Sequence, residues 1–304
     1  MSATGEIINA LTIDVEDYFH VTAFEGDVSR AKWHCYPQRV ERNTHKILEI
    51  LDEANTRATF YFVGWIADAY PQLVREIFDL GHEIGSHSYW HRLIYDLTPA
   101  EFRSDLRRSK QLLEDLVGSS IDAFRAPSFS ITEKSLWSLD ILAEEGFVTD
   151  SSVFPIYHDR YGIHNAPTQV HKIQTDSGDL LEFPPSVVKR MRFNLPVSGG
   201  GYFRLYPLSW TLKWLDEINE NGDPFVFYFH PWEIDADQPR LRAGSVIGRI
   251  RHHLNLHRTE ERFRTLLSRF SFDTIGHSLR CWQERQDAGI NGKQSIVRSA
   301  NSYS

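Results

Sequence analysis

The chain has little cysteine: Cys35 and Cys281 are the only two in 304 residues. Two cysteines are too few for a disulfide framework, and their spacing matches no metal-binding motif. We therefore expect two free thiols in a protein of a reducing compartment.

The sequence also lacks the features that direct a chain to or across a membrane. Residues 1–6 contain no basic region, and the apolar run from Ile7 to Ile13 contains Asn9 and leads into acidic residues. This pattern is typical of a strand and not of a signal peptide. No window approaches the roughly 20 apolar residues of a membrane-spanning helix. The sequence thus predicts a cytoplasmic protein without a transmembrane segment.

An excess of positive charge is missing as well. The formal net charge is −8 at pH 7, which argues against a general nucleic-acid binder. The charge is uneven, however, because between Arg240 and Arg269 eight arginines stand against Glu260 and Glu261, a local excess of +6. This segment is either a solvated helical face or a platform for an anionic substrate, a carrier phosphate or a membrane surface.

The chain does have a large apolar content, arranged in alternating strand-like and helix-like segments. Hydrophobic residues make up 41% of the sequence and aromatic residues 13%, enough for a large core. Short apolar runs alternate with amphipathic segments as far as residue 230, which predicts an α/β protein with βα units around a parallel sheet. The predicted strands are 7–14, 58–63, 83–86, 123–126, 147–150, 180–183 and 224–230, and the predicted helices are 38–54, 66–80, 98–117, 133–145 and 208–221.

We expect three parts along the chain. Residues 1–235 would form the barrel-like domain, 236–282 a C-terminal extension packed on it, and 283–304 a flexible polar tail. Within the extension, 247–270 is predicted to be helical and 272–275 could add a last strand.

Polar residues with catalytic potential recur at the ends of the predicted strands. Asp14, His87, Arg125, Asp150 and His230 each lie at or just after the C-terminal end of one of them. In a β/α barrel that rim is where active sites are assembled. We therefore expect these five residues to lie close together.

Two of these strand ends carry groups that bind a divalent metal. His87 and His91 are four residues apart, so a helical turn, or a tight loop after a strand, can direct both imidazoles at one ion. Asp14, Glu16 and Asp17 form an acidic strand end, and alternation places Asp14 and Glu16 on one side and Asp17 on the other. Such ligands, with one position open to water, make a nucleophile near neutral pH. The alternatives are a chance histidine pair on a surface helix and acids that form a helix N-cap or a solvated turn.

The other strand-end residues are candidates for proton transfer. Arg125 follows Phe124 in a strand expected to be buried, where an unpaired guanidinium is costly, so Asp14 is its expected partner. Asp150 could hold one ring nitrogen of His230, raise its pKa and leave the other nitrogen to donate a proton. A structural salt bridge and an ordinary core histidine are the alternatives.

At this point the motifs resemble those of a known family. Residues 12–233 contain, in order, T-I-D-V-E-D, H-S-Y-W-H, R-A-P-S-F, D-S-S and F-Y-F-H-P-W-E, which are similar to the five motifs of the NodB-homology polysaccharide deacetylases, carbohydrate esterase family four. A narrower resemblance, to the branch found with exosortase-linked exopolysaccharide gene clusters and to its C-terminal extension, rests on D-V-E-D-Y-F-H, P-I-Y-H-D-R-Y-G-I, S-G-G-G-Y-F-R and H-P-W-E-I-D.

The resemblance implies a fold and an activity. The fold would be a deformed (β/α) barrel of about seven strands with a mainly helical C-terminal extension. The activity would be removal of N-acetyl groups from amino sugars with one divalent ion, whose ligands include His87 and His91. A backbone N–H near Pro127 would help to stabilise the charge of the tetrahedral intermediate.

The resemblance also implies how protons move. Asp14 would be the base that deprotonates the metal-bound water, and Arg125 would tether it. His230 would protonate the leaving amine, with Asp150 as its partner.

Two departures from the family pattern leave details open. The family has adjacent aspartates in its first motif, whereas this chain has D-V-E-D, so the third metal ligand is either Glu16, which we favour, or Asp17 after a turn. The third motif usually has an aromatic residue directly after its proline, but here Ser128 precedes Phe129. The substrate contact there could therefore differ.

Two loops are expected to shape a substrate groove. The loop 24–36 follows the first strand and carries Trp33, which would hang over the rim. Three glycines precede Tyr202, which suits close backbone approach to a sugar ring, although a plain flexible turn is the alternative. Trp232 could stack on a pyranose face or fill the barrel mouth.

The sequence thus predicts a metal-dependent hydrolase that removes N-acetyl groups from N-acetylhexosamine units of a polysaccharide or its precursor, in exopolysaccharide or cell-envelope synthesis. The precursor could be lipid-linked or nucleotide-linked. The expected cofactor is one divalent ion, Zn²⁺ or else Co²⁺, Ni²⁺ or Mn²⁺, and the expected partner is a carbohydrate and not a nucleic acid. The alternatives are a hydrolase of a small cyclic amide or ureide, as in allantoinase-like relatives, and a non-catalytic carbohydrate-binding protein.

Overall fold

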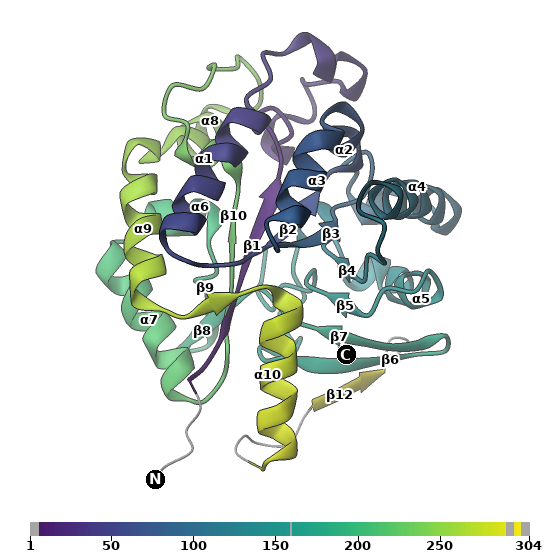
Figure 1. Ribbon diagram of the computed structural model, residues 1–304, viewed down its shortest axis with the longest axis vertical. Coiled ribbons are helices and arrows are strands. Elements are labelled where there is room, and N and C mark those ends of the chain that lie inside the picture. Colours follow the sequence, from purple (N-terminus) through teal and green to yellow (C-terminus); the bar gives the residue numbers. More distant parts are fainter. Residues whose placement is uncertain (1–5, 159, 290–294, 299–304) are drawn as a thin grey trace.

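A computed structural model describes residues 6–158, 160–289 and 295–298 and shows an α/β fold (Figure 1). Seven parallel strands lie side by side in the order β10-β1-β2-β3-β4-β5-β7. They are β10 (Val226–Phe229), β1 (Asn9–Val15), β2 (Thr59–Phe62), β3 (Glu83–Ser86), β4 (Ala123–Phe124), β5 (Thr149–Asp150) and β7 (Gly178–Glu182). The predicted fold, a deformed β/α barrel of about seven strands, is confirmed.

The deformation lies between the first and last of these strands. Among the described residues no strand pairing joins β7 to β10. The segment between them fills this gap with single contacts: Tyr228 N donates to Ser198 O at 2.7 Å, and Val226 N donates to Ser186 Oγ at 3.0 Å. The barrel is therefore closed on this side without a continuous ladder.

Helices form the outer layer of the barrel (Figure 1). The helix predicted for 66–80 is two helices, because Tyr70 leaves the helical conformation directly before Pro71. The next helix begins as the sequence predicts, with a capping box formed by Thr98 and Glu101. The outer helices are α1 (Val40–Glu53), α2 (Gly64–Ala69), α3 (Pro71–Asp79), α4 (Pro99–Val117), α5 (Trp137–Glu144), α7 (Leu208–Glu220) and α9 (Thr259–Arg269).

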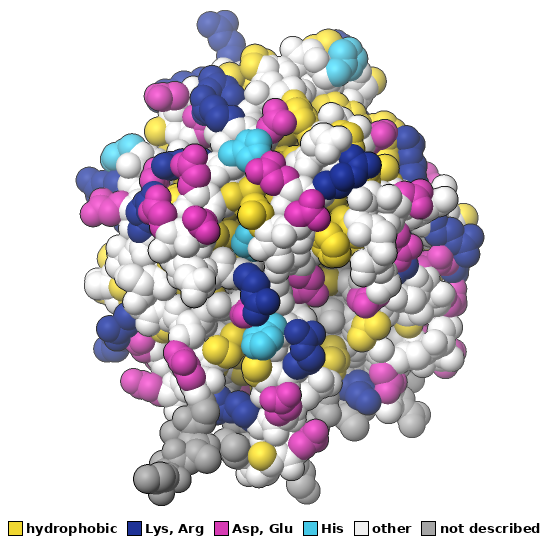
Figure 2. Space-filling view, in the orientation of Figure 1, with side chains coloured by type: hydrophobic (Ala, Val, Ile, Leu, Met, Phe, Trp, Pro, Cys, Tyr) yellow, Lys and Arg dark blue, Asp and Glu magenta, His cyan; other side chains and the backbone are white. Residues whose placement is uncertain are grey.

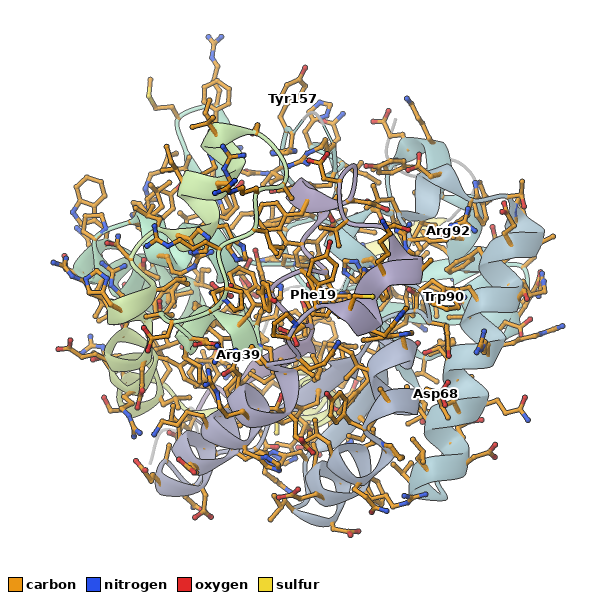
Figure 3. All side chains as sticks on the ribbon, turned by 90° about the horizontal axis from the view of Figure 1, so that it is seen from above. Phe19, Arg39, Asp68, Trp90, Arg92 and Tyr157 are labelled. Atoms are coloured by element: carbon orange, nitrogen blue, oxygen red, sulfur yellow. The ribbon has the colours of Figure 1, made fainter. Side chains whose placement is uncertain are left out.

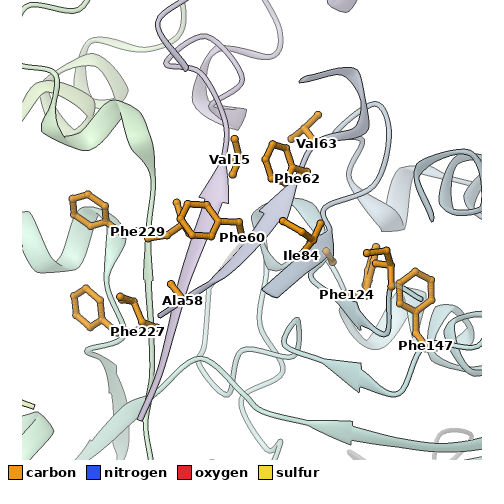
Figure 4. Packing of buried hydrophobic residues seen from close by; sticks show 14 of the residues in the cluster. Val15, Ala58, Phe60, Phe62, Val63, Ile84, Phe124, Phe147, Phe227 and Phe229 are labelled. Atoms are coloured by element: carbon orange, nitrogen blue, oxygen red, sulfur yellow. The ribbon is translucent and has the colours of Figure 1, made fainter. Parts of the chain in front are cut away.

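Alternation along the strands sorts side chains between the helices and the barrel interior. Ile13 and Val15 of β1 and Phe62 of β2 belong to the main core between strands and helices (Figure 4). Tyr61 packs instead with residues that face into the barrel. Asp14 is the register partner of Tyr61, so its carboxylate also faces the barrel interior.

Four elements between residues 171 and 205 were not predicted. β6 (His171–Thr175) pairs antiparallel with β7 and extends the sheet, and β8 (Val187–Arg190) and β9 (Phe193–Pro196) form a separate hairpin. α6 (Gly200–Leu205) follows this hairpin. These strands are half exposed and polar, so they lack the apolar runs by which buried strands were identified.

The C-terminal part is mainly helical, and its last long helix covers the lower end of the barrel (Figure 1). α8 (Val246–His253) and α9 are followed by β11 (Phe272–Asp273), which pairs with β1, and by α10 (Ile275–Asp287). Leu279 and Trp282 of α10 pack with the barrel-interior residue Tyr61, and Figure 1 shows α10 below the strands. In the described ranges no helix combines the length and the apolar character needed to cross a membrane.

Part of the predicted polar tail has regular structure. α10 continues to Asp287, and β12 (Ser295–Arg298) pairs with β6. Residues 290–294 and 299–304 of the tail lie outside the described residues.

Candidate metal centre and active site

Three side chains from two strand ends form a cluster that fits a metal ion. Glu16 follows β1, and His87 and His91 follow β3. Glu16 Oε1 lies 3.1 Å from His87 Nε2 and 2.9 Å from His91 Nε2, and all three side chains are buried. Two imidazoles and a carboxylate are a ligand set of catalytic zinc sites, which keep one position open to water. The structure brings these predicted ligands together.

The protonation of these groups also suits a cation. His87 Nδ1 lies 2.7 Å from the carbonyl oxygen of Arg125, to which it donates, so Nε2 is the ring nitrogen left to bind a metal beside Glu16. Burial alone would raise the pKa of Glu16, but the neighbouring His91, His87 and His230 hold it well below its ordinary value. An ionised carboxylate and an oriented imidazole are the forms that bind a metal.

The turn that carries His91 is held by backbone contacts and is not a helix. Ser88 and His91 both adopt positive φ angles, 60° and 51°. The buried carboxylate of Asp105, on α4, accepts hydrogen bonds from the backbone N–H groups of Tyr89 (2.7 Å) and Trp90 (3.1 Å). A tight loop after a strand, one of the two predicted possibilities, therefore directs both imidazoles at one point.

A buried ion pair lies beside the cluster. Arg125 Nη1 donates to Asp14 Oδ1 at 2.7 Å and to Thr12 Oγ1 at 2.6 Å, and Arg125 Nη2 donates to Ser151 Oγ at 2.8 Å. Both Asp14 and Arg125 are almost fully buried, so the guanidinium compensates the carboxylate charge. Asp14 Oδ2 is 3.9 Å from His230 Nε2, across the mouth of the barrel. The Asp14–Arg125 contact is the one predicted from the sequence.

The partner of His230 differs from the prediction. His230 Nδ1 lies 2.7 Å from Glu233 Oε1, and Glu233 in turn accepts from Arg204 Nε at 2.7 Å. Burial would lower the pKa of His230, but Glu233, together with Glu16 and Asp14, raises it to about 9. Glu233 fixes the ring so that Nε2 faces Asp14. In the motif H-P-W-E the two residues are three positions apart, and a single turn brings their side chains together.

The predicted contact between Asp150 and His230 is wrong. Asp150 is in register with Phe124 on one side and Glu182 on the other, so its side chain lies on the helix-facing side of the sheet, away from the barrel interior. There its Oδ1 accepts from Ser152 Oγ. Burial raises the pKa of both Asp150 and Glu182, so this pair retains a proton.

Asp17, the alternative third ligand, is also engaged elsewhere. Its Oδ2 accepts from the backbone N–H groups of Arg39 (2.6 Å) and Val40 (3.0 Å), and its Oδ1 accepts from Tyr18 N. Asp17 therefore accepts hydrogen bonds from backbone N–H groups at the N-terminus of α1, which have no partner within the helix. Alternation on β1, which favoured Glu16, agrees with this arrangement.

His20 is a neighbour of the cluster that sequence reasoning did not assign. Its ring centroid is 6.3 Å from that of His91, and its Nδ1 accepts from Asp17 N at 2.9 Å. Because Nδ1 uses its lone pair in this way, Nε2 of the neutral ring carries the proton and cannot be a metal ligand. Within the described residues this buried Nε2 has no hydrogen-bond partner.

The predicted sugar-binding residues surround the same rim but differ in exposure. Trp33 is 3% exposed and Trp232 5% exposed, and Trp232 stacks on His230 at 5.2 Å, so both tryptophans fill the barrel mouth and leave little ring surface for a sugar. Pro127 is buried in a short turn whose next residues have positive φ, and Tyr202 is half-buried with its hydroxyl 3.3 Å from Tyr161 Oη.

The glycines before Tyr202 serve the fold. Gly199 has φ of 132°, and a Cβ placed there would lie 2.0 Å from the carbonyl oxygen of Tyr228. The close backbone approach is thus to β10 and not to a sugar. In the view from above in Figure 3, Phe19 lies near the centre, Trp90 lies to the right of it and Tyr157 lies at the upper margin.

The Glu233 contact leads to a pH-dependent prediction. A proton donor must be protonated, so loss of the His230 proton would set the alkaline limb of the pH–rate profile for kcat/KM. Because Glu233 raises the pKa of His230, Glu233→Gln should shift that limb to lower pH and reduce kcat about 10- to 100-fold. Asp150→Asn is the matched control and should leave the limb in place. If Asp150→Asn shifts the alkaline limb and Glu233→Gln does not, Asp150 and not Glu233 is the partner of His230.

Two family models match different parts of the chain. Residues 32–145 match the model of the polysaccharide deacetylase family, and residues 151–280 match a domain of unknown function, DUF3473. The latter match crosses residue 235, where the barrel domain is predicted to end. These matches support a relationship of the chain to the polysaccharide deacetylases.

Curated relatives cover about a third of the chain. Peptidoglycan-N-acetylglucosamine deacetylase of Bacillus cereus is 30% identical over 120 residues, 36% of this chain and 44% of the relative. Peptidoglycan deacetylase of Helicobacter pylori is 27% identical over 121 residues, 38% and 40% of the two chains. Chitooligosaccharide deacetylase of Azorhizobium caulinodans is 32% identical over 100 residues, 33% and 45% of the two chains. The matched part thus spans less than half the length of these relatives.

A solved structure resembles nearly the whole chain. The crystal structure of a Mycobacterium smegmatis protein, provisionally assigned as a polysaccharide deacetylase, has a TM-score of 0.63 and covers 98% of this chain and 96% of its own, with 18% sequence identity. At this identity the likeness shows the fold alone.

Proposed function

We propose that this protein is a divalent-metal hydrolase that removes N-acetyl groups from an N-acetylhexosamine-containing carbohydrate. The observation that carries the proposal is that the cluster of Glu16, His87 and His91 lies beside two groups suited to proton transfer. These groups are Asp14 and His230, whose Oδ2 and Nε2 atoms are 3.9 Å apart. Relatives named as deacetylases of peptidoglycan N-acetylglucosamine and of chitooligosaccharides support the choice of substrate.

Each side chain has a role in amide hydrolysis. A divalent ion held by Glu16, His87 and His91 would polarise the acetyl carbonyl and lower the pKa of water. Asp14 would accept the proton of the attacking water through Oδ2, since Arg125 occupies Oδ1. His230 would deliver a proton from Nε2 to the departing nitrogen.

The reaction is balanced by one water. Its oxygen forms a bond to the acetyl carbon, the amide C–N bond breaks, and the products are acetate and a free amino sugar. The two proton-transfer groups lie at the ends of two different strands, β1 and β10, that are direct neighbours in the sheet. A single rim therefore supplies both a base and an acid to one reacting bond.

Release of acetate tests the proposal. Oligomers of N-acetylglucosamine, N-acetylgalactosamine and N-acetylmannosamine are compared as substrates. We expect the purified chain, supplied with Zn²⁺ or Co²⁺, to release acetate and free amine in equal amounts from the oligomers of at least one of these three sugars. A chelator should stop the release. Absence of acetate from all of these oligomers, with either metal, would contradict the proposal, and ring opening of allantoin under the same conditions would favour the cyclic-amide alternative.

The biological setting is a further part of the proposal. Exopolysaccharide or cell-envelope synthesis, a lipid-linked or nucleotide-linked precursor and a cytoplasmic location stay predictions from the sequence. The choice of Zn²⁺ over Co²⁺, Ni²⁺ or Mn²⁺ rests on the ligand types, since imidazole and carboxylate suit several of these ions.

A further inference from the structure

The short helix α8 exposes large aliphatic side chains to solvent. Val246, Ile247 and Ile250 are 62%, 63% and 62% exposed. Residues three and four positions apart lie on one side of a helix, so these three form one apolar face. The helix is well defined at its start, where Ser245 Oγ accepts from Gly248 N at 3.0 Å.

Arginines without acidic partners flank this face. From Gln238 to Thr259 the sequence has no aspartate or glutamate. Within the described residues none of the segment's arginines forms a salt bridge, although Arg249 donates to the carbonyl oxygens of Ala243 and Gly244. These arginines are Arg240, Arg242, Arg249, Arg251 and Arg258.

Two of the three remaining arginines of the basic segment behave differently, whereas Arg262 donates to the backbone carbonyl oxygens of Phe203 and Tyr206. Arg264 pairs with Glu53 and Glu260, and Arg269 pairs with Asp216 at 2.9 Å. The local charge excess seen in the sequence is therefore concentrated around α8. The exposed Asp237 precedes this segment in the chain, and Asp27 accepts from Gly244 N.

The α8 segment is attached to the active-site rim. Arg204, which pairs with Glu233, donates through Nη1 to the carbonyl oxygens of His252 (2.7 Å) and Leu254 (3.0 Å). His252 stacks on Trp232 with ring centroids 4.4 Å apart. The apolar face and its arginines thus lie beside the mouth of the barrel, where Figure 1 shows α8 at the upper end.

Two other parts of the described surface differ from the region around α8. On the face shown in Figure 2, side chains of both charges are interspersed, and hydrophobic side chains are scattered between them. At the tip of the β8–β9 hairpin, Met191 and Phe193 are 95% and 68% exposed. The nearby Arg190 is paired there with Glu217 at 2.6 Å.

We propose that α8 and its flanking arginines, here called the α8 surface, dock on an anionic lipid bilayer. Val246, Ile247 and Ile250 would enter the boundary between headgroups and acyl chains, and the arginines would contact lipid phosphates. An aliphatic face bordered by arginines without acidic partners is complementary to such a membrane. A soluble polyanion would contact only the arginines and would leave the aliphatic side chains without a partner. Docking would bring the mouth of the barrel to the membrane surface, and it does not depend on the proposed reaction.

Vesicle binding tests the α8 surface. We expect the full chain to sediment with vesicles of 30% phosphatidylglycerol in phosphatidylcholine, but not with phosphatidylcholine alone, and binding should weaken with salt. The double variants Ile247→Glu/Ile250→Glu and Arg242→Gln/Arg251→Gln should each bind at least about tenfold more weakly. Met191→Glu/Phe193→Glu is the matched control, since it removes two apolar groups that are more exposed than the isoleucines and lie elsewhere.

Three results of the vesicle measurements would overturn the proposal. The first is a wild-type chain that does not bind anionic vesicles, and the second is a pair of α8 variants that both bind like the control. The third is loss of binding in the arginine variant with binding kept in the isoleucine variant, because that result indicates a site for soluble polyanions. Each variant is checked by thermal unfolding and by acetate release from a water-soluble oligosaccharide, which should not change, so failure of the α8 surface is distinguishable from failure of the catalytic proposal.

Discussion

Replacing His87 or His91 with alanine is expected to remove both the bound metal and the activity. Each imidazole would supply one of three protein ligands, and its Nε2 lies within 3.1 Å of the Glu16 carboxylate. Loss of even an outer partner of a metal ligand costs about 10- to 100-fold in affinity or activity, so loss of a ligand should exceed about 100-fold. We expect the zinc content to fall from about one ion per chain to near zero.

Metal analysis and acetate release on the same samples measure this effect. His257→Ala is the matched control, because His257 is exposed and lies away from the cluster. Variants that retain a full equivalent of zinc and wild-type turnover would show that the pair of histidines is not the metal site. Thermal unfolding separates metal loss from misfolding.

Asp14→Asn should strongly reduce turnover and leave the metal in place. Asparagine keeps the shape of the side chain and an oxygen for Arg125, but the amide cannot accept the proton of water. General base catalysis contributes about 10²- to 10⁴-fold, so kcat should fall within that range while the zinc content stays at one ion per chain. A large fall in kcat with retained metal distinguishes the general base from the metal ligands, whose loss removes both.

The same variant separates an enzyme from a non-catalytic carbohydrate-binding protein. Asp79→Asn, at an exposed position on α3, is the matched control and should have wild-type kcat. If Asp14→Asn leaves acetate release unchanged, Asp14 is not the base. If neither the wild-type chain nor the variants release acetate but all bind the oligosaccharide equally, the binding-protein alternative holds.

Strand periodicity predicted the α/β fold and placed the site residues at strand ends, whereas the resemblance to the polysaccharide deacetylases implied the deformed barrel and the roles of those residues. The apolar strands β1, β2 and β10 were identifiable as runs, and alternation from Ile13 and Val15 already places Asp14 and Glu16 on one face. The preference for Glu16 over Asp17 as a ligand rests on this alternation, and the positions of the two carboxylates in the structure agree with it.

The error at Asp150 arose where the strand is irregular. β5 contains only Thr149 and Asp150, while Phe147 packs in the helix-facing core and Val148 is half exposed. Alternation counted from Phe147 would send Asp150 into the barrel, but the register with Phe124 places it on the other side. Register between neighbouring strands is a tertiary property that one sequence does not contain.

Glu233 was missed for a different reason. The spacing from His230 was visible, but nothing local shows that residue 233 turns back toward the ring. That geometry depends on Arg204, 29 residues earlier, which fixes the second carboxylate oxygen of Glu233 in a buried ion pair. Contacts of this kind follow from packing of α6 against the rim, and α6 itself was not predicted.

Anomalous diffraction at the zinc absorption edge, from crystals grown with one equivalent of Zn²⁺, tests the central claim most directly. We expect one strong peak bounded by Glu16 Oε1, His87 Nε2 and His91 Nε2, with Asp14 and His230 facing it. A peak at Asp17 or at another part of the chain, with the two imidazoles of the cluster free of metal, would contradict the account.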